Sequence, residues 1–304
     1  MISGWIVLDK PLGLGSTQAV AAVKRNLREA GFGKVKVGHG GTLDPLATGV
    51  LPIAVGEATK LAGRMLDASK EYAFTVCFGA ETDTLDLEGT VIALSNVRPS
   101  RAMLEQALEG FRGTINQIPP AYSALMVGGK RAYDLARAGE EVALPLRSVT
   151  ISALVLEEIE GRTDALESAT LRAHVSKGTY IRSLARDIAL ALDTRGHVTM
   201  LRRLRAGPFD LAQAISLDKL NQLGKGAALE HSILPLEAGL VDIPALDLEP
   251  EQARAVRQGR VLNGLPLPDG LYWARAGHVP VALVELSGAV LTVLRGFNIP
   301  DVAE

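Results

Sequence analysis

The segment VGHGGTLDPLATGVLPIAVGEATKL, residues 37–61, places a glycine-rich loop directly before an apolar strand. The loop, residues 38–49, contains four glycines and a single carboxylate, Asp44, which stands between Leu43 and Pro45. Asp-Pro is a common turn dipeptide, so Asp44 could be a turn residue only. Glycine also lets the backbone approach a ligand closely, and loops on rigid scaffolds commonly carry chemistry. Asp44 could therefore equally be a metal ligand, a phosphate acceptor or a catalytic carboxylate.

The composition is that of an ordinary globular chain: 304 residues, 47% hydrophobic and 22% charged. That length fits one large domain, or a large domain with a small one. The sequence contains no apolar run of 18 residues, and the apolar run at residues 5–8 is too short for a signal peptide. We therefore expect a soluble, cytoplasmic protein with no membrane association. The single cysteine, Cys77, excludes an intrachain disulfide, and the five histidines form no HxxxH or HxH pair, which argues against a metal site.

Strand and helix patterns alternate irregularly, with hairpin-like pairs, which predicts an α+β fold with a mixed sheet rather than a doubly wound parallel sheet. A proline- and glycine-containing break between Pro235 and Pro244 predicts a domain boundary near residue 240. Residues 1–240 would then form the main domain, and residues 241–304 a small β-rich module. Strands are expected at residues 4–10, 49–56, 70–79, 89–94, 141–159, 168–176 and 197–209, and helices at 57–69, 100–113, 130–139 and 180–192, with a further helix beginning at Ser16 or Thr17.

The acidic segment ETDTLDLEG, residues 81–89, has four carboxylates within eight residues. Its spacing does not match a calcium-binding EF-hand loop, which needs oxygen ligands at alternate positions and a glycine at the sixth. We therefore interpret the segment as a solvated hairpin turn rather than a metal site.

Basic residues cluster although the net charge is −2. Residues 24–39 contain five basic side chains against one acid, and residues 172–205 contain eight against two. Such segregation can create a cationic face for nucleic acid, although solvated faces that never meet would fit the same pattern. Tyr180 and Arg182 lie in the second cluster at a strand-to-helix junction. An aspartate, an arginine that pairs with it, aromatic residues and basic rims together fit a site that modifies a nucleic-acid base.

Five segments resemble the bacterial TruB family, the tRNA pseudouridine-55 synthases, and they occur in the family's order over most of residues 1–210. The resemblance implies a pseudouridine synthase fold, with a central mixed and mostly antiparallel sheet, flanking helices and a C-terminal PUA-like RNA-binding module. It also implies an isomerase that flips uridine 55 out of the tRNA T loop and needs no metal or organic cofactor. The segments are LDKPLGLGST, VGHGGTLDPLATGVLPIAVGEATKL, KEYAFTVCFGAETDTLDLEG, QIPPAYSALMVGGKRAYDLARAG and HVSKGTYIRSLARDI.

The resemblance also assigns roles to individual residues. Asp44 matches the essential catalytic carboxylate, Arg182 its arginine partner, and Tyr72 the tyrosine that stacks on the flipped uracil and could transfer a proton. His39 matches the histidine that fills the gap left by the base. Further expected binding residues are Tyr180 and Met200 in the uracil pocket, Lys10 and Lys130 at phosphates or as braces of the site, and Arg202 and Arg203 of the second basic cluster on the RNA.

The expected partner is the tRNA T stem-loop, bound by a monomer without an obligate protein partner. Two other functions are open to such a chain. One is an RNA chaperone or T-arm-binding protein that keeps the fold without the chemistry, and the other is an aspartyl-phosphate hydrolase that uses TLDP. An intact set of Asp44, Tyr72 and Arg182 argues against the first. The absence of a second aspartate two residues from Asp44 argues against the other.

Overall fold

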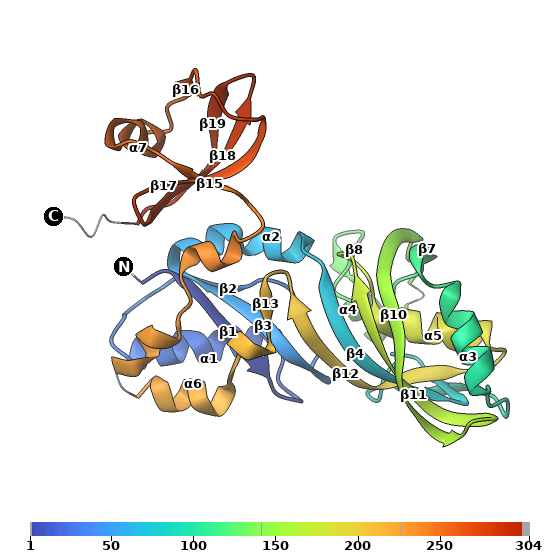
Figure 1. The fold of residues 1–304 in the computed structure, drawn as a ribbon. Helices are drawn as coiled ribbons and strands as arrows, with labels where there is room; N and C mark the ends of the chain where they lie inside the picture. The colour runs from blue at the N-terminus through green and yellow to red at the C-terminus, as the bar shows by residue number, and fades with distance from the viewer. Residues whose placement is uncertain (1, 141, 226, 300–304) are drawn as a thin grey trace. The chain divides into compact units, whose positions relative to one another are not determined.

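The computed structural model describes residues 2–140, 142–225 and 227–299, and the chain divides into two compact units (Figure 1). Unit 1 comprises Met1–Leu43, Val50–Leu66 and Gly207–Glu304, and unit 2 comprises Asp44–Gly49 and Asp67–Ala206. Neither unit begins or ends at residue 240, so the domain boundary expected there from the sequence stays a prediction.

Unit 2 is built on a mixed sheet with the strand order β3–β12–β4–β11–β10–β7. Strand β3 runs parallel to β12, and the other neighbouring pairs along this order are antiparallel. The prediction of a mixed, mostly antiparallel sheet is therefore confirmed. The strands are β3 (Ala47–Val55), of which unit 2 holds the first three residues, β4 (Lys70–Phe78), β7 (Gly113–Gln117), β10 (Arg147–Arg162), β11 (Ala165–Val175) and β12 (Gly196–Ala206).

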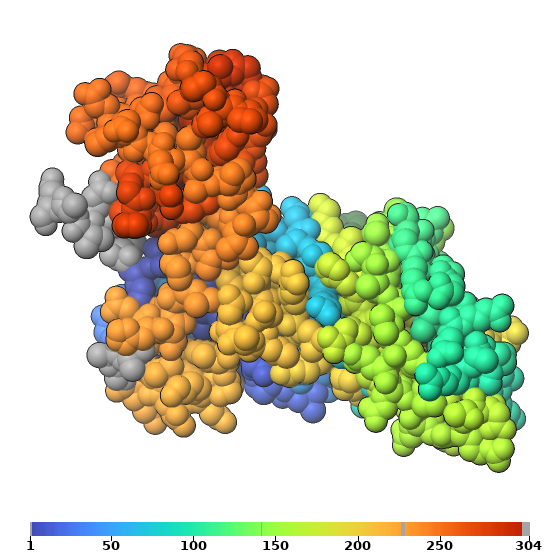
Figure 2. Space-filling model, in the orientation of Figure 1, coloured from blue at the N-terminus to red at the C-terminus, as the bar shows by residue number. Residues whose placement is uncertain are grey.

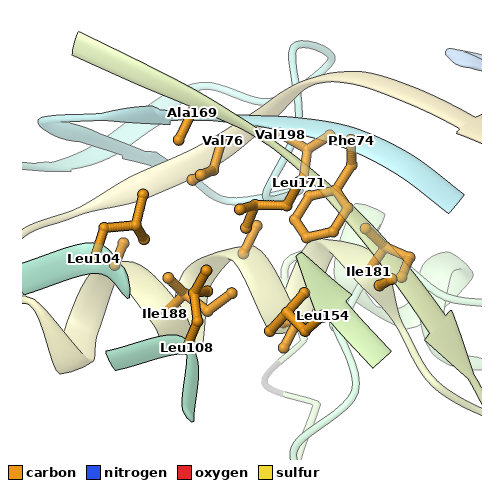
Figure 3. Packing of buried hydrophobic residues seen from close by; sticks show 14 of the residues in the cluster. Phe74, Val76, Leu104, Leu108, Leu154, Ala169, Leu171, Ile181, Ile188 and Val198 are labelled. Atoms are coloured by element: carbon orange, nitrogen blue, oxygen red, sulfur yellow. The ribbon is translucent and has the colours of Figure 1, made fainter. Parts of the chain in front are cut away.

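Alternation along β4 explains the core of unit 2. Phe74, Val76 and Phe78 point to one face of the sheet and are buried, because successive side chains of a strand point to opposite faces. Helices α3 (Arg101–Glu109) and α5 (Ile181–Ala191) bury their apolar sides against this face, including Leu104 and Ile188 (Figure 3). Burying an aliphatic or Phe side chain of this kind stabilises the fold by roughly 1.5–3 kcal/mol. The core thereby fixes α5, which carries Arg182.

Two hairpins and a short helix complete unit 2. Strand β5 (Ala80–Thr82) pairs with β6 (Val91–Leu94), and β8 (Met126–Val127) pairs with β9 (Lys130–Arg131), which leads into α4 (Ala132–Arg137). The acidic segment connects β5 to β6, as the sequence predicts for a hairpin.

Unit 1 contains β1 beside β14, in parallel, and β2 antiparallel to the second half of β3. Trp5 is completely buried and donates a hydrogen bond from Nε1 to the carbonyl oxygen of Leu236 at 3.1 Å. The helix expected at residues 57–69 begins as a 3-10 helix, in which the Thr59 hydroxyl donates to the Gly56 carbonyl, and continues as α2. The remaining elements are β1 (Gly4–Lys10), α1 (Ser16–Glu29), β2 (Val37–His39), η1 (Gly56–Leu61), α2 (Ala62–Asp67), β13 (Phe209–Asp210), η2 (Leu211–Gln213), β14 (Ile215–Ser216), α6 (Leu217–Leu223), η3 (Ala227–Ser232) and η4 (Leu236–Gly239).

The C-terminal part of the chain, from β15 to β19, forms a five-stranded sheet of its own, called the C-terminal module below, with the order β15–β17–β18–β19–β16. Its own core includes Leu246, Val256, Val284 and Leu291, and its red and orange residues pack closely in the space-filling view (Figure 2). The expected β-rich module is confirmed, although residues 300–304 of the expected range lie outside the described residues. Its elements are β15 (Ala245–Asp247), α7 (Pro250–Arg257), β16 (Leu262–Asn263), β17 (Gly270–Ala276), β18 (Val279–Ser287) and β19 (Val290–Gly296).

Candidate active site

Asp44 and Arg182 form an ion pair, with 3.0 Å between Arg182 Nε and Asp44 Oδ2. Asp44 lies in the loop before β3, where its carbonyl oxygen accepts a hydrogen bond from the Ala47 amide at 3.0 Å. Arg182 is the second residue of α5, and its side chain is 7% exposed against 39% for Asp44. The arginine is thus held in the interior while the aspartate reaches toward solvent.

The guanidinium of Arg182 is fixed by further acceptors. Its Nη1 donates to the Thr84 carbonyl oxygen at 2.7 Å, and its Nη2 donates to the Tyr122 carbonyl oxygen at 3.0 Å. Its Nη1 also lies 3.6 Å from Asp86 Oδ2. A planar guanidinium with several fixed acceptors has little rotational freedom, so it holds Asp44 in a defined position.

Asp86 is a site residue that sequence reasoning missed. Its side chain is 9% exposed, and its Oδ1 accepts hydrogen bonds from the Thr84 hydroxyl at 2.6 Å and the Glu88 amide at 3.0 Å. The interpretation of residues 81–89 as a wholly solvated turn is therefore wrong for Asp86. The available signal was Leu85, an apolar residue inside the acidic turn. It is buried, adopts a φ of 64°, and accepts a hydrogen bond from the Val198 amide.

The residues on either side of Asp44 are also fixed by short-range contacts. Ser16, the first residue of α1, donates from Oγ to the Leu43 carbonyl at 2.9 Å and accepts from the Leu43 amide at 2.8 Å. At the other end, Gly49 adopts a φ of +100°, and a Cβ there would lie 2.1 Å from the Arg203 carbonyl oxygen. Only glycine therefore permits β3 to pair with β12 at this position.

Two cavities meet at this ion pair. The larger has a volume of about 440 Å³, within the range of small-molecule sites, and is lined by Asp44, Asp86 and Arg182 together with Tyr122, Tyr133 and Arg137. The smaller one shares Asp44, Asp86 and Arg182 and is also lined by Met200. The arrangement offers a partly exposed carboxylate at the edge of a space that could receive a nucleoside.

Tyr72 and Tyr180, also predicted to contact the uracil, lie elsewhere than Met200. Tyr72 is partly buried on β4 and packs against the unit 2 core. Tyr180 precedes α5, where Gln117 bonds both its amide and its carbonyl, and the Arg147 guanidinium lies 5.6 Å from its ring centre. Neither tyrosine is among the described residues that line the two cavities. Their contact with a uracil stays a prediction.

The predicted residues of unit 1 are His39 and Lys10. His39 ends β2, and its Nδ1 accepts a hydrogen bond from the Gly41 amide at 3.4 Å. Lys10 is completely buried, and its Nζ donates to the carbonyl oxygens of Pro11 and Leu14 at 3.0 and 2.6 Å. These bonds fix the loop that follows β1, and the two roles expected for Lys10, at a phosphate or as a brace of the site, stay predictions.

The three basic residues of unit 2 that were expected to contact RNA differ in their exposure. Lys130 is exposed in the β8–β9 hairpin, and Arg202 Nη1 donates to the Thr48 hydroxyl at 3.3 Å. Arg203 does not fit the expected RNA-facing role, because it is 1% exposed and its guanidinium lies inside the protein. Burial and the nearby charge of Arg203 also lower the pKa of Lys70 to about 8, with Asp67 partly opposing them.

Comparisons with known proteins assign the chain to a family. Residues 28–181 match the family described as TruB family pseudouridylate synthase (N terminal domain), and residues 182–241 match the tRNA pseudouridylate synthase B C-terminal domain. The chain belongs to the TruB family. A TruB-family relative from Novosphingobium aromaticivorans, tRNA pseudouridine synthase B, is 76% identical over 304 residues, which is 100% of both chains. The protein of that name from Zymomonas mobilis is 57% identical and covers 98% of this chain and 96% of its own.

Solved structures show the same fold. The TruB-family chain is similar to a chain in "Crystal Structure of a Cbf5-Nop10-Gar1 Complex", with a TM-score of 0.71 and 28% identity over 98% of this chain and 85% of the other. A chain in "Structure of H/ACA RNP bound to a substrate RNA containing 2'-deoxyuridine" has the same TM-score at 26% identity, with the same coverage. The predicted pseudouridine synthase fold is therefore confirmed.

Proposed function

We propose that this chain is a tRNA pseudouridine synthase that isomerises uridine 55 in the T loop of tRNA. The observation that carries the proposal is the Asp44–Arg182 ion pair at the edge of a cavity of about 440 Å³, in a member of the TruB family. Its relatives at up to 76% identity bear the name tRNA pseudouridine synthase B.

The reaction is an isomerisation, so atoms and electrons balance without a second substrate. The N1–C1′ bond of uridine breaks, the uracil turns, C5 bonds to C1′, and the proton on C5 leaves while N1 gains one. The base must first leave its stacked position, at a cost of a few kcal/mol. Asp44 either attacks the sugar or removes a sugar proton, and its partly exposed carboxylate suits both roles.

The remaining residues have supporting roles in this proposal. Tyr72 stacks on the uracil and is the candidate for the C5 proton transfer, and His39 fills the place of the flipped base. Aromatic stacking of this kind contributes about 1–3 kcal/mol per base. The other proposed contacts are Tyr180 and Met200 at the uracil, Lys130 and Arg202 at phosphates, and a PUA-like C-terminal module as a second RNA-binding surface.

We also propose that the chain acts in the cytoplasm as a monomer without an obligate protein partner. Asp44, Asp86 and Arg182 all come from one chain, so the ion-pair cluster is complete in a single copy. Among residues 2–140, 142–225 and 227–299, no helix is long and apolar enough to cross a membrane. Light scattering after gel filtration, with and without tRNA, tests the monomer.

The activity is tested by incubating the protein with an unmodified tRNA transcript and no added cofactor, followed by nucleoside analysis and mapping of position 55. We expect pseudouridine at position 55, and none in a transcript with cytidine there. An RNA chaperone would bind the transcript without forming pseudouridine. An aspartyl-phosphate hydrolase would release phosphate from a phosphate ester and leave the transcript unchanged.

A further inference from the structure

The motif GEATKL, residues 56–61, forms the 3-10 helix η1 and has no role in the proposed reaction. Gly56 has a φ of +60°, and a Cβ there would lie 2.3 Å from the Ile2 carbonyl oxygen, so the turn needs glycine. The Glu57 amide donates to Ser3 Oγ at 3.1 Å, which anchors the same turn. These contacts fix the backbone of η1 and therefore the positions from which its charged side chains extend.

Glu57 and Lys60 connect η1 to the end of the C-terminal module. Lys60 Nζ lies 2.6 Å from Glu57 Oε2 and donates to the Gly296 carbonyl oxygen at 2.8 Å. The same Glu57 oxygen accepts a hydrogen bond from the Asn298 amide at 2.6 Å. The side chain of Lys60 is 28% exposed and that of Glu57 is 15% exposed, so solvent screens these charge-assisted bonds less than it screens a surface pair.

The segment held by this pair belongs to the core of the module. Phe297, between Gly296 and Asn298, is 3% exposed, and its amide donates to the Val281 carbonyl oxygen in β18. The contacts from Glu57 and Lys60 therefore act on the folded module rather than on a loose tail.

A second contact holds the other end of the module. Arg64 Nη2 lies 2.9 Å from Asp242 Oδ2, and Asp242 precedes β15, the first strand of the module. Residues 57–64 thus contact the chain both where it enters the module and where it leaves β19. Asp242 is 67% exposed, so solvent screens this pair more strongly than the Glu57–Lys60 pair.

The ionisation of Glu57 follows from its contacts. Burial raises the pKa of the carboxyl, but the Asn298 amide, the Lys60 ammonium and the charge of Lys36 together outweigh it, so the pKa is lowered from its ordinary value. Glu57 is therefore anionic at neutral pH, as both of its contacts require.

We propose that Glu57 and Lys60 are positioning residues for tRNA binding, because they fasten the C-terminal module in one orientation before the RNA arrives. The proposal rests on the proposed function. A module fixed in advance loses less conformational freedom on binding, so its fastening strengthens tRNA affinity without touching the reacting atoms. Releasing it raises the KM for tRNA and leaves kcat at saturating tRNA unchanged.

The test uses the full chain and the variants Glu57→Ala and Lys60→Met. We expect KM for tRNA to rise roughly fivefold in each, with kcat within about twofold of the original chain. The conservative variant Lys60→Arg keeps a cation near Glu57 and the Gly296 carbonyl, so its KM for tRNA should stay close to that of the original chain. The matched control is Glu105→Ala, which removes an exposed ion pair with Arg101 on α3 (2.8 Å) and should leave KM unchanged.

Hydrogen–deuterium exchange supplies a readout that does not depend on activity. In Glu57→Ala the amide of Asn298 loses its acceptor, so peptides covering residues 296–299 should exchange faster, while those of β18 keep their protection. Unchanged exchange would overturn the fastening itself. If exchange is faster but the KM for tRNA is unchanged, or if only kcat decreases, the proposed role of the Glu57–Lys60 pair in tRNA binding is overturned. If the original chain makes no pseudouridine, the proposed function fails and the exchange result still decides whether the module is fastened.

Discussion

Arg182 and Arg172 are both arginines of unit 2 that lie between two carboxylates, yet only one of them builds a site. Arg182 faces Asp44 and Asp86 and is 7% exposed, whereas Arg172, on β11, faces Glu157 and Glu71 and is 49% exposed. Arg182 also donates to two backbone carbonyls, which fixes the plane of its guanidinium. Solvent screens the charges around Arg172, so that cluster contributes little. Burial and backbone acceptors, rather than the number of ion pairs, distinguish a site from a surface cluster.

The largest expected effect comes from Asp44→Asn, which removes the one carboxylate of the Arg182 cluster that reaches solvent. The amide is nearly isosteric but can act neither as a nucleophile nor as a base, so turnover should fall at least roughly a thousandfold. The affinity for tRNA should change little. Steady-state pseudouridine formation and filter binding measure the two quantities. Activity within tenfold of the original chain would remove Asp44 from the reaction.

Arg182→Lys should have the next largest effect. Lysine keeps the positive charge but cannot donate at once to Asp44, Thr84 and Tyr122 from a rigid plane, so we expect turnover to fall roughly a hundredfold. Lysine also leaves one or both of the Thr84 and Tyr122 carbonyl oxygens without their donor, and a buried polar group left unsatisfied costs about 1–3 kcal/mol, so the melting temperature should fall too. Rates are therefore compared well below the melting temperature of the variant. Unchanged kinetics would mean that a charge alone suffices and that the fixed plane is irrelevant.

Asp86→Asn should have an intermediate effect. Asp86 acts through its contact with Arg182 and is not itself the carboxylate proposed to react. The amide oxygen can still accept from the Thr84 hydroxyl and the Glu88 amide, so the turn should keep its shape. Loss of the negative charge near Arg182 should lower kcat roughly tenfold. Glu81→Gln, in the same acidic segment but paired with Arg195, is the matched control and should stay near the original rate. Equal rates for the two variants would make Asp86 an ordinary turn residue.

Much of this arrangement could be predicted from local sequence, because it depends on local rules. Alternation predicts the buried face of β4, and the periodicity of residues 180–192 predicts α5. Asp44 is a candidate because of its glycine-rich loop, and Arg182 because of its place at a basic strand-to-helix junction, while the resemblance to the TruB family assigns their roles. Local sequence does not predict Asp86 as a site residue, because the acidic turn is fixed by a hydrogen bond from the Val198 amide to the Leu85 carbonyl oxygen, and Val198 is distant in the sequence. The burial of Arg203 likewise follows from the pairing of β12 with its neighbours, which local patterns do not determine.

Arg172→Ala should have the smallest effect. It belongs to the basic cluster of residues 172–205, but its charge is already balanced by Glu157 and Glu71. We therefore expect kcat and the KM for tRNA both to stay within about twofold, and stability to fall by no more than about 1 kcal/mol. Thermal unfolding and a salt titration of tRNA affinity check this. A clear decrease in the salt dependence would show that Arg172 contacts a phosphate after all.

The most direct test of the site is a single-turnover measurement on tRNA that carries tritium at C5 of uridine 55, with protein in excess. Tritium leaves only when C5 gives up its proton to become bonded to the sugar, so its release reports the isomerisation itself. We predict release of close to one tritium per tRNA by the original chain and by Arg172→Ala, and none by Asp44→Asn on the same timescale. Release by Asp44→Asn as fast as by Arg172→Ala would contradict the assignment of the Asp44–Arg182 pair as the catalytic centre.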